Sequence, residues 1–299
     1  TDIIQQINSW SPTQTLRTNQ TKKYCEILGK IISNFHYHSS RINDSFFRPE
    51  LITQEAISNW KEKIQSLFQI AEKNIEPGFF NKKIFQDSFN LLKSNLNKFF
   101  ENKGWNKLLS TMKIKIHQDL HLSQMITIKS TKQIDFILFD FEGDPLLSNK
   151  EKLQKDPIFR DLAGICSAFH YIKFNALKQQ FEKESKKKKE NFAEIYLKLL
   201  LNASNFSGNK NFHISQLIQF AKQWEQYCQR TFLESYIQQL KYHKLTFNLD
   251  LTNKTDFKNQ LKLFRIERLI KELYYETVFR KKMIIIPIIG LLELNKESY

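Results

Sequence analysis

The sequence predicts an α+β protein that is dominated by helices and carries one small β-hairpin region. Over most of the 299 residues, apolar side chains recur at intervals of three and four, which is typical of amphipathic helices. Between residues 112 and 139 the pattern changes to three short runs that are rich in Ile and partly alternate. With 41% hydrophobic residues, such a chain can bury a sizeable core as one large domain or two small ones.

The elements follow from these patterns in chain order. Helices are expected at residues 22–36, 53–74 and 82–101, and again at 160–182, 191–201, 214–242 and 257–279. Strands are expected at residues 112–116, 124–128 and 134–139, with a turn at 130–132. We interpret the apolar stripe of the third helix as core; it consists of Phe85, Phe89, Leu92, Leu96 and Phe99.

The net charge of +15 would suit nucleic acid, an anionic membrane surface or phosphorylated ligands. Lys is spread with Asn and Ile along the whole chain, which is typical of an A+T-rich coding bias, so we expect no specific nucleic-acid partner. Residues 183–190 form a basic low-complexity segment, which we interpret as a solvated connection, with a docking patch as the alternative.

Cysteine spacing and hydropathy exclude several classes of protein. Cys25, Cys166 and Cys228 are odd in number and far apart, so neither a disulfide framework nor a zinc site is indicated and we expect core thiols. The longest apolar run, residues 283–292, is too short for a membrane span and contains Pro287 and Gly290. Residues 1–21 do not have the charged and apolar pattern of a signal peptide, so we expect a cytoplasmic protein.

Two acidic segments flank the predicted hairpin, HQDLHLSQ at residues 117–124 and DFEGDP at residues 140–145. Phosphoryl transfer needs a carboxylate that accepts the hydroxyl proton and oxygen ligands that hold Mg²⁺ against the nucleotide phosphates. Protein kinases provide these groups in H-R-D-x-x-x-x-N and D-F-G segments. At matching spacing, Asp119 takes the place of the base, while Gln124 and Asp140 offer oxygen ligands.

Two histidines in the first segment, His117 and His121, have the spacing of a helical metal pair. Such a pair would have to share a helix face, and the strand-like flanks argue against that. We therefore expect His117 to brace the loop.

The sequence resembles the maltokinases, a family of the aminoglycoside-phosphotransferase-like branch of the kinase fold that is often fused to trehalose synthase. The family signature HGDLHLGQ is similar to HQDLHLSQ, and LLDFEGEP is similar to LFDFEGDP at residues 138–145. The segment DPIFRDLAGICSAFHYI at residues 156–172 resembles SPLRDVAGMLRSFDYA. Shorter matches occur near both ends, so that the resemblance covers nearly the whole chain in order.

The resemblance implies a C-terminal kinase-like lobe over residues 1–299 and a role for each matched residue. Asp119 would be the catalytic base, and Gln124, Asp140 and Glu142 would be Mg²⁺ ligands. Asp161 would brace the catalytic loop together with His117, although a helix N-terminal carboxylate would account for Asp161 alone. The implied cofactors are ATP and Mg²⁺, the acceptor is maltose, and a trehalose synthase domain is an expected partner; no membrane is implied.

The sequence departs from the family at three places. Too few residues precede position 22 for a nucleotide-covering lobe, so we expect a fragment, half of a split enzyme, or a degenerate product. The family's RPDW reads RKKM at residues 280–283, which leaves Tyr274 or Tyr275 to stack on a sugar. Gln118 replaces the loop Gly, which adopts special backbone shapes more easily. Near these changes the sequence still matches the family pattern at Tyr275, Glu276 and Arg280, which we take as substrate-binding candidates.

Three functions remain open from the sequence. The first is a maltokinase-like phosphotransferase lobe, whose parent transfers the γ-phosphate of ATP to maltose and forms maltose 1-phosphate. The second is a kinase-like enzyme for another small hydroxylated substrate, because the fold and the base do not fix the acceptor. The third is an inactive pseudokinase or a basic helical binding module.

Overall fold

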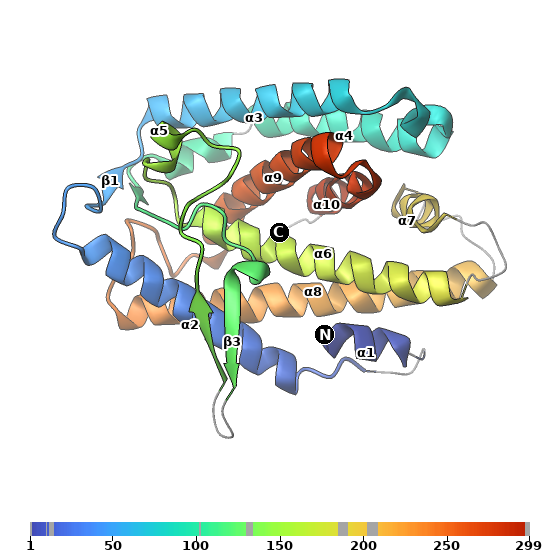
Figure 1. Cartoon of the computed structure of the whole chain (residues 1–299), viewed down its shortest axis with the longest axis horizontal. Helices are drawn as coiled ribbons and strands as arrows, with labels where there is room; N and C mark the ends of the chain where they lie inside the picture. Colours follow the sequence, from blue (N-terminus) through green and yellow to red (C-terminus); the bar gives the residue numbers. More distant parts are fainter. Residues whose placement is uncertain are drawn as a thin grey trace.

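Helices make up most of the molecule, which confirms the predicted α+β class (Figure 1). The computed structural model describes residues 2–9, 11, 15–101, 103–129, 134–184, 191–201 and 209–296. Its helices are α1 (Asp2–Asn8), α2 (Asn19–Arg41), α3 (Gln54–Asn74), α4 (Lys83–Glu101), α5 (Asn149–Lys152), α6 (Phe159–Glu184), α7 (Phe192–Leu201), α8 (Asn209–Tyr242), α9 (Lys254–Phe279) and α10 (Ile285–Lys296). Its strands are β1 (Glu50–Leu51), β2 (Met112–Lys113), β3 (Met125–Lys129) and β4 (Ile134–Leu138).

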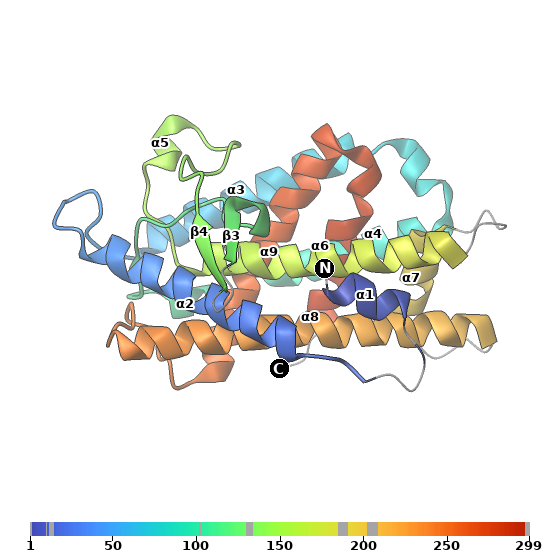
Figure 2. The same ribbon diagram turned by 60° about the horizontal axis from the view of Figure 1, so that its bottom comes forward.

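The long helix α6 runs through the middle of the molecule and packs against α8 on one side and α9 on the other (Figure 1, Figure 2). Helix α2 lies along α8, and α3 lies along α9. Helix α4 packs beside α7 and α10. The beginning of α6 therefore reaches the region where the loop between β2 and β3 crosses the helices (Figure 1).

All seven helices expected from the apolar stripes are present, with ends shifted by a few residues. Helix α10, which was not predicted, covers most of the apolar run that contains Pro287 and Gly290. Pro287 lies in its first turn, where the backbone N–H groups lack helical partners in any case. A Cβ at Gly290 would lie 2.9 Å from Nε2 of His170, so the glycine lets α10 approach α6 closely.

The strands form two antiparallel pairs, β1 with β2 and β3 with β4. The hairpin register pairs Met125 with Leu138 and Lys129 with Ile134, and its expected turn at residues 130–132 lies outside the described residues. The strand expected at 112–116 is shorter than predicted, because after β2 only an isolated bridge from Ile114 to Asp156 continues the pairing. Residues 185–190 of the basic segment also lie outside the described part of the chain.

The core contains the predicted Phe and Leu stripe of α4, whose five members are all buried. Cys25, Cys166 and Cys228 are buried free thiols, which agrees with their interpretation as core residues. Within the described ranges, no helix combines the length and the apolar character that crossing a membrane would require.

Candidate active site

A buried carboxylate holds the loop that carries HQDLHLSQ. Asp161, in the first turn of α6, accepts hydrogen bonds from the backbone N–H groups of His117 at 2.9 Å and Gln118 at 3.0 Å. Its Oδ2 also lies 3.1 Å from Nε2 of His36, and Nδ1 of His36 lies 2.7 Å from the Tyr236 hydroxyl. Because a carboxylate only accepts, Nε2 of His36 donates, and Nδ1 accepts from the tyrosine. The loop is thus tied to α6, α2 and α8 together.

Neither His36 nor Tyr236 was predicted from the sequence as part of this support. The sequence offered one signal for His36, its position directly after the apolar stripe of α2, and the structure shows that its side chain is fully buried. A buried polar side chain requires a partner. The sequence alone could not identify that partner, which lies 125 residues away.

The second acidic segment joins the loop through His117. Nε2 of His117 donates to the Phe139 carbonyl over 2.9 Å, and the His117 ring lies 4.9 Å from the ring of Phe141. The Phe139 N–H donates to the Gln124 carbonyl at 3.2 Å, so Gln124 and Asp140 lie at the same end of the hairpin. His117 and His121 do not share a helix face, because His117 precedes the short 3₁₀ turn Leu122–Gln124.

Gln124, Asp140 and Glu142 offer oxygen atoms to a cation. Within the described ranges, their side chains have no hydrogen-bond or ion-pair partner, and Asp140 and Glu142 are exposed. Amide and carboxylate oxygens with water access suit Mg²⁺, which keeps several waters and binds phosphate oxygens together with one or two carboxylates. The donor set therefore fits a Mg²⁺–nucleotide complex, in which the phosphates would complete the coordination.

A tighter group of potential ligand atoms lies elsewhere and already holds a cation. Among the described residues, three His, Cys, Asp or Glu side chains come within 4.8 Å of one another at His170, Glu225 and Glu293. The buried ammonium of Lys173 lies 2.7 Å from Glu225 and 2.6 Å from Glu293. Because Lys173 neutralises these carboxylates, we interpret the group as a structural ion cluster.

A cavity of about 570 Å³ borders Asp119. Helix α6 contributes one wall with Gly164, Ala168 and Tyr171, and α9 contributes another. A Cβ at Gly164 would lie 2.1 Å from the Leu120 carbonyl oxygen, so this glycine lets α6 approach the loop. The cavity thus places a carboxylate beside a space large enough for a small hydroxylated molecule.

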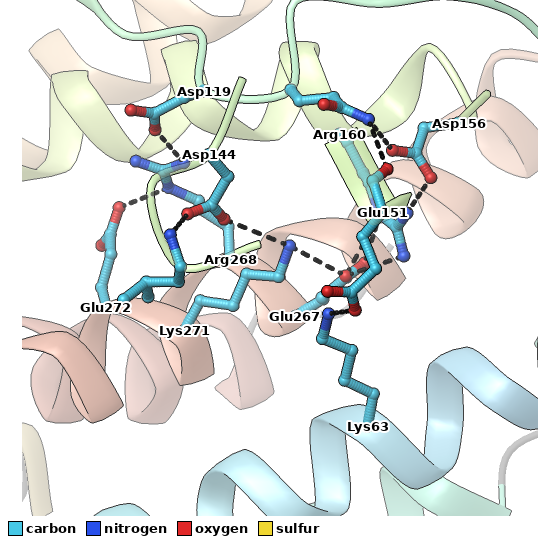
Figure 3. A network of polar contacts seen from close by, with 12 residues as sticks. Lys63, Asp119, Asp144, Glu151, Asp156, Arg160, Glu267, Arg268, Lys271 and Glu272 are labelled. Atoms are coloured by element: carbon cyan, nitrogen blue, oxygen red, sulfur yellow. Dashed lines mark hydrogen bonds and ion pairs between the residues drawn. The ribbon is translucent and has the colours of Figure 1, made fainter. Parts of the chain in front are cut away.

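Charged residues of α9 pair across the cavity wall (Figure 3). Nη1 of Arg268 lies 3.2 Å from Oδ1 of Asp119, and its Nε donates to Glu272 over 2.8 Å. Lys271 lies 3.8 Å from Asp144 and 3.4 Å from Glu267. Ion pairing with Glu272 and Asp119 raises the pKa of Arg268 despite its burial, so the guanidinium stays charged.

His121 lies beside Asp119 on the loop side of the cavity. Its Nε2 is 3.8 Å from Oδ2 of Asp119, and its Nδ1 accepts the Ser123 N–H. Burial lowers the pKa of His121 below its ordinary value, although the Asp119 carboxylate opposes the shift. The imidazole is therefore neutral at pH 7.

The predicted substrate residues lie at the far end of the same wall. Tyr275 and Arg280 line the cavity, and the guanidinium of Arg280 lies 5.0 Å from the Tyr275 ring centroid. Glu276 is buried behind them, where it accepts from Tyr171 at 3.1 Å and from Arg280 at 2.6 Å. Burial raises the pKa of Glu276, and Arg280 opposes this shift. Of the two tyrosines considered as sugar platforms, Tyr275 faces the cavity and Tyr274 packs against the core.

Four further residues line the cavity that were not predicted from the sequence: Arg268, Lys271, Asp144 and Tyr171. The α9 residues recur at spacings of three and four, and so share one helix face. That pattern identifies a polar face, but it does not say what the face opposes. The packing of α9 against α6 decided this.

No protein-family model matches the chain. Solved structures of glucosamine kinases are similar in fold: the chain matches crystal form B with a TM-score of 0.66 at 14% identity, over 98% of this chain and 57% of that one. A glucosamine kinase in complex with glucosamine, ADP and inorganic phosphate matches with a TM-score of 0.64 at 13% identity, over 97% and 59%. The chain therefore has a kinase fold and spans less than two thirds of these proteins.

Proposed function

We propose that this chain is the C-terminal lobe of an ATP-dependent sugar kinase, and that maltose is the acceptor in the full-length parent. The observation that carries the proposal is the position of Asp119. It lies at the cavity, on a loop tied to the hairpin end that presents Gln124 and Asp140. The similarity in fold to glucosamine kinases supports a sugar kinase.

In this function Asp119 accepts the proton of the acceptor hydroxyl and orients it toward the γ-phosphate. Arg268 binds Oδ1 of Asp119, so Oδ2 is the oxygen left for the acceptor. Asp161 and His117 act through the loop backbone and keep Asp119 at the cavity. Arg268 and Lys271 would offer cationic hydrogen-bond donors at the cavity wall to the transferred phosphoryl group.

Gln124, Asp140 and Glu142 would hold Mg²⁺, which when bound neutralises the phosphate oxygens of ATP. The lobe that covers the adenine and phosphates would lie outside residues 1–299. This agrees with the chain's span of 57–59% of the glucosamine kinases. A fused or associated trehalose synthase domain remains a proposed partner on the basis of the sequence resemblance.

The cavity also suits an uncharged acceptor. Its lining carries three carboxylates, Asp119, Asp144 and Glu272, and three cations, Arg268, Lys271 and Arg280. Its formal charges therefore balance, and its polar groups can bind hydroxyls. Tyr275 offers an aromatic surface in place of the missing family tryptophan. Because RKKM replaces RPDW, another small hydroxylated substrate is the second candidate.

The test is a phosphotransfer assay with the natural full-length protein, ATP and Mg²⁺. Maltose, glucose and glucosamine serve as acceptors, and phosphorus NMR identifies the product. Maltose 1-phosphate as the preferred product supports the proposal, and preference for another acceptor supports the second candidate. ATP turnover with none of the sugars would refute both. Residues 1–299 alone should bind ATP poorly and show negligible turnover.

A further inference from the structure

Gln118, between His117 and the proposed base Asp119, has an unfavourable backbone conformation. Its φ is +71°, in the left-handed region that glycine adopts without cost. For a residue with a Cβ this conformation is unfavourable, because the Cβ comes too close to the neighbouring carbonyl oxygen. The side chain of Gln118 therefore has to offset that cost through contacts of its own.

The Gln118 side chain is buried, and hydrogen bonds hold its amide nitrogen. Its Nε2 lies 3.1 Å from Oδ2 of Asp156, 3.2 Å from the Gln154 carbonyl and 3.4 Å from the Glu151 carbonyl. Its Oε1 packs against Gly143, where a Cβ would lie only 2.6 Å away. Three acceptors thus converge on one donor group, and none of them could pair with a carboxylate in its place.

The segment that receives this amide is itself held firmly. Asp156 exchanges two backbone hydrogen bonds with Ile114, at 3.0 and 2.8 Å, and its carboxylate pairs with Arg160. Arg160 also binds Glu267 on α9 at 3.0 Å, and Glu267 reaches Lys271 in the cavity wall (Figure 3). The amide therefore connects the loop to the same helix that carries the cavity's charged residues.

We propose that Gln118 is a positioning residue, whose side-chain amide sets the backbone orientation that directs Asp119 into the cavity. This inference rests on the proposed kinase function. It predicts that a hydrogen-bond donor is required at position 118, and that its charge matters less. A misplacement of a catalytic group by about 1 Å can cost on the order of a hundredfold in rate.

The experiment compares three variants of the full-length protein in the sugar phosphorylation assay. Gln118→Ala removes the donor, Gln118→Glu replaces it with acceptors only, and Gln118→Lys restores donors that face the same three acceptors. We expect kcat to fall about 10- to 100-fold in the first two with a smaller change in KM, and Gln118→Lys to recover most of the loss. Equal turnover in all three variants would overturn the proposal.

A backbone control separates positioning from relief of strain. Lys244 is exposed and also has a positive φ of 53°, far from the loop in sequence. Both Gln118→Gly and Lys244→Gly remove the unfavourable positive φ of a residue with a Cβ, but only Gln118→Gly also removes a side-chain amide. Lys244→Gly should keep full turnover, whereas Gln118→Gly should lose it without a lower unfolding midpoint. Full turnover in Gln118→Gly would show that the amide has no positioning role.

Hydrogen exchange provides a readout that does not depend on activity. The amides of His117 and Gln118 are protected by Asp161, so Gln118→Ala should speed exchange in a peptide spanning residues 112–124. Peptides from α8 should be unchanged. Unchanged exchange in both regions would refute the positioning role even if the protein phosphorylates sugars. Faster exchange in a protein that phosphorylates none would refute the kinase function alone.

Discussion

Replacement of Asp119 by Asn in the full-length protein tests the proposed chemistry most directly. The change is nearly isosteric, and it removes the negative charge that faces Arg268 across 3.2 Å. Both side chains are about one-fifth exposed, at 19% and 20%, and Arg268 keeps its bond to Glu272. The loss of such a partly exposed pair costs about 1 kcal/mol of unfolding free energy or less.

The kinetic effect should be much larger than the effect on stability. General base action contributes about a hundred- to ten-thousandfold, which corresponds to roughly 3–5 kcal/mol in the activation free energy. Asp119→Asn should therefore lower kcat by that factor. The KM for the sugar should change only modestly, since the amide still hydrogen-bonds the hydroxyl. The measurement is steady-state phosphorylation with urea unfolding of the same preparation.

A magnesium titration distinguishes the base from the proposed metal ligand. Asp140→Asn removes an exposed carboxylate that would bind Mg²⁺, so raising the Mg²⁺ concentration should partly restore its turnover. The same titration should leave the Asp119→Asn defect unchanged. If both variants responded equally to Mg²⁺, or if Asp119→Asn kept near full turnover, the assigned roles would be wrong.

Three further predictions concern packing, pH and charge. Gly164→Ala places a Cβ 2.1 Å from a loop carbonyl and should lower both stability and turnover, while Gly78→Ala, with its nearest neighbour at 3.9 Å, should change neither in the same assays. Burial alone would raise the pKa of Glu293, but Lys173 and a second lysine lower it to about 2 from 4.5, so this carboxylate's stabilisation should be lost as pH falls from about 4.5 to 2. In urea unfolding at a series of pH values, Glu293→Gln should have a lower free energy of unfolding at pH 7, and that free energy should depend less on pH between 4.5 and 2. The control Glu234→Gln, at an exposed position, should show the same pH dependence of stability as the unchanged protein. Nucleic-acid binding should be weak and should fall steeply with salt in a titration; tight binding at high salt would contradict the interpretation of the +15 charge.

The sequence by itself determined the features that depend on neighbours along the chain. Apolar stripes predicted seven helices because the helical period is local, and the alternating Ile-rich runs predicted β3 and β4. The spacing of Asp119, Gln124 and Asp140 around that hairpin also followed from the sequence. It was sufficient to suggest phosphoryl transfer, because a hairpin returns the chain to the point where it began.

Only the tertiary structure decided which distant groups meet these residues. Arg268 reaches Asp119 across 149 positions and His36 reaches Asp161 across 125, and no local pattern encodes either contact. The cavity exists because α9 and the start of α6 pack beside the loop, with Gly164 allowing the close approach. From the sequence alone, Gln118 was a replacement for glycine with no evident reason. The structure shows three acceptors around its side-chain amide. Such contacts depend on the packing of whole helices, which is settled by the core as a whole and not by any one segment.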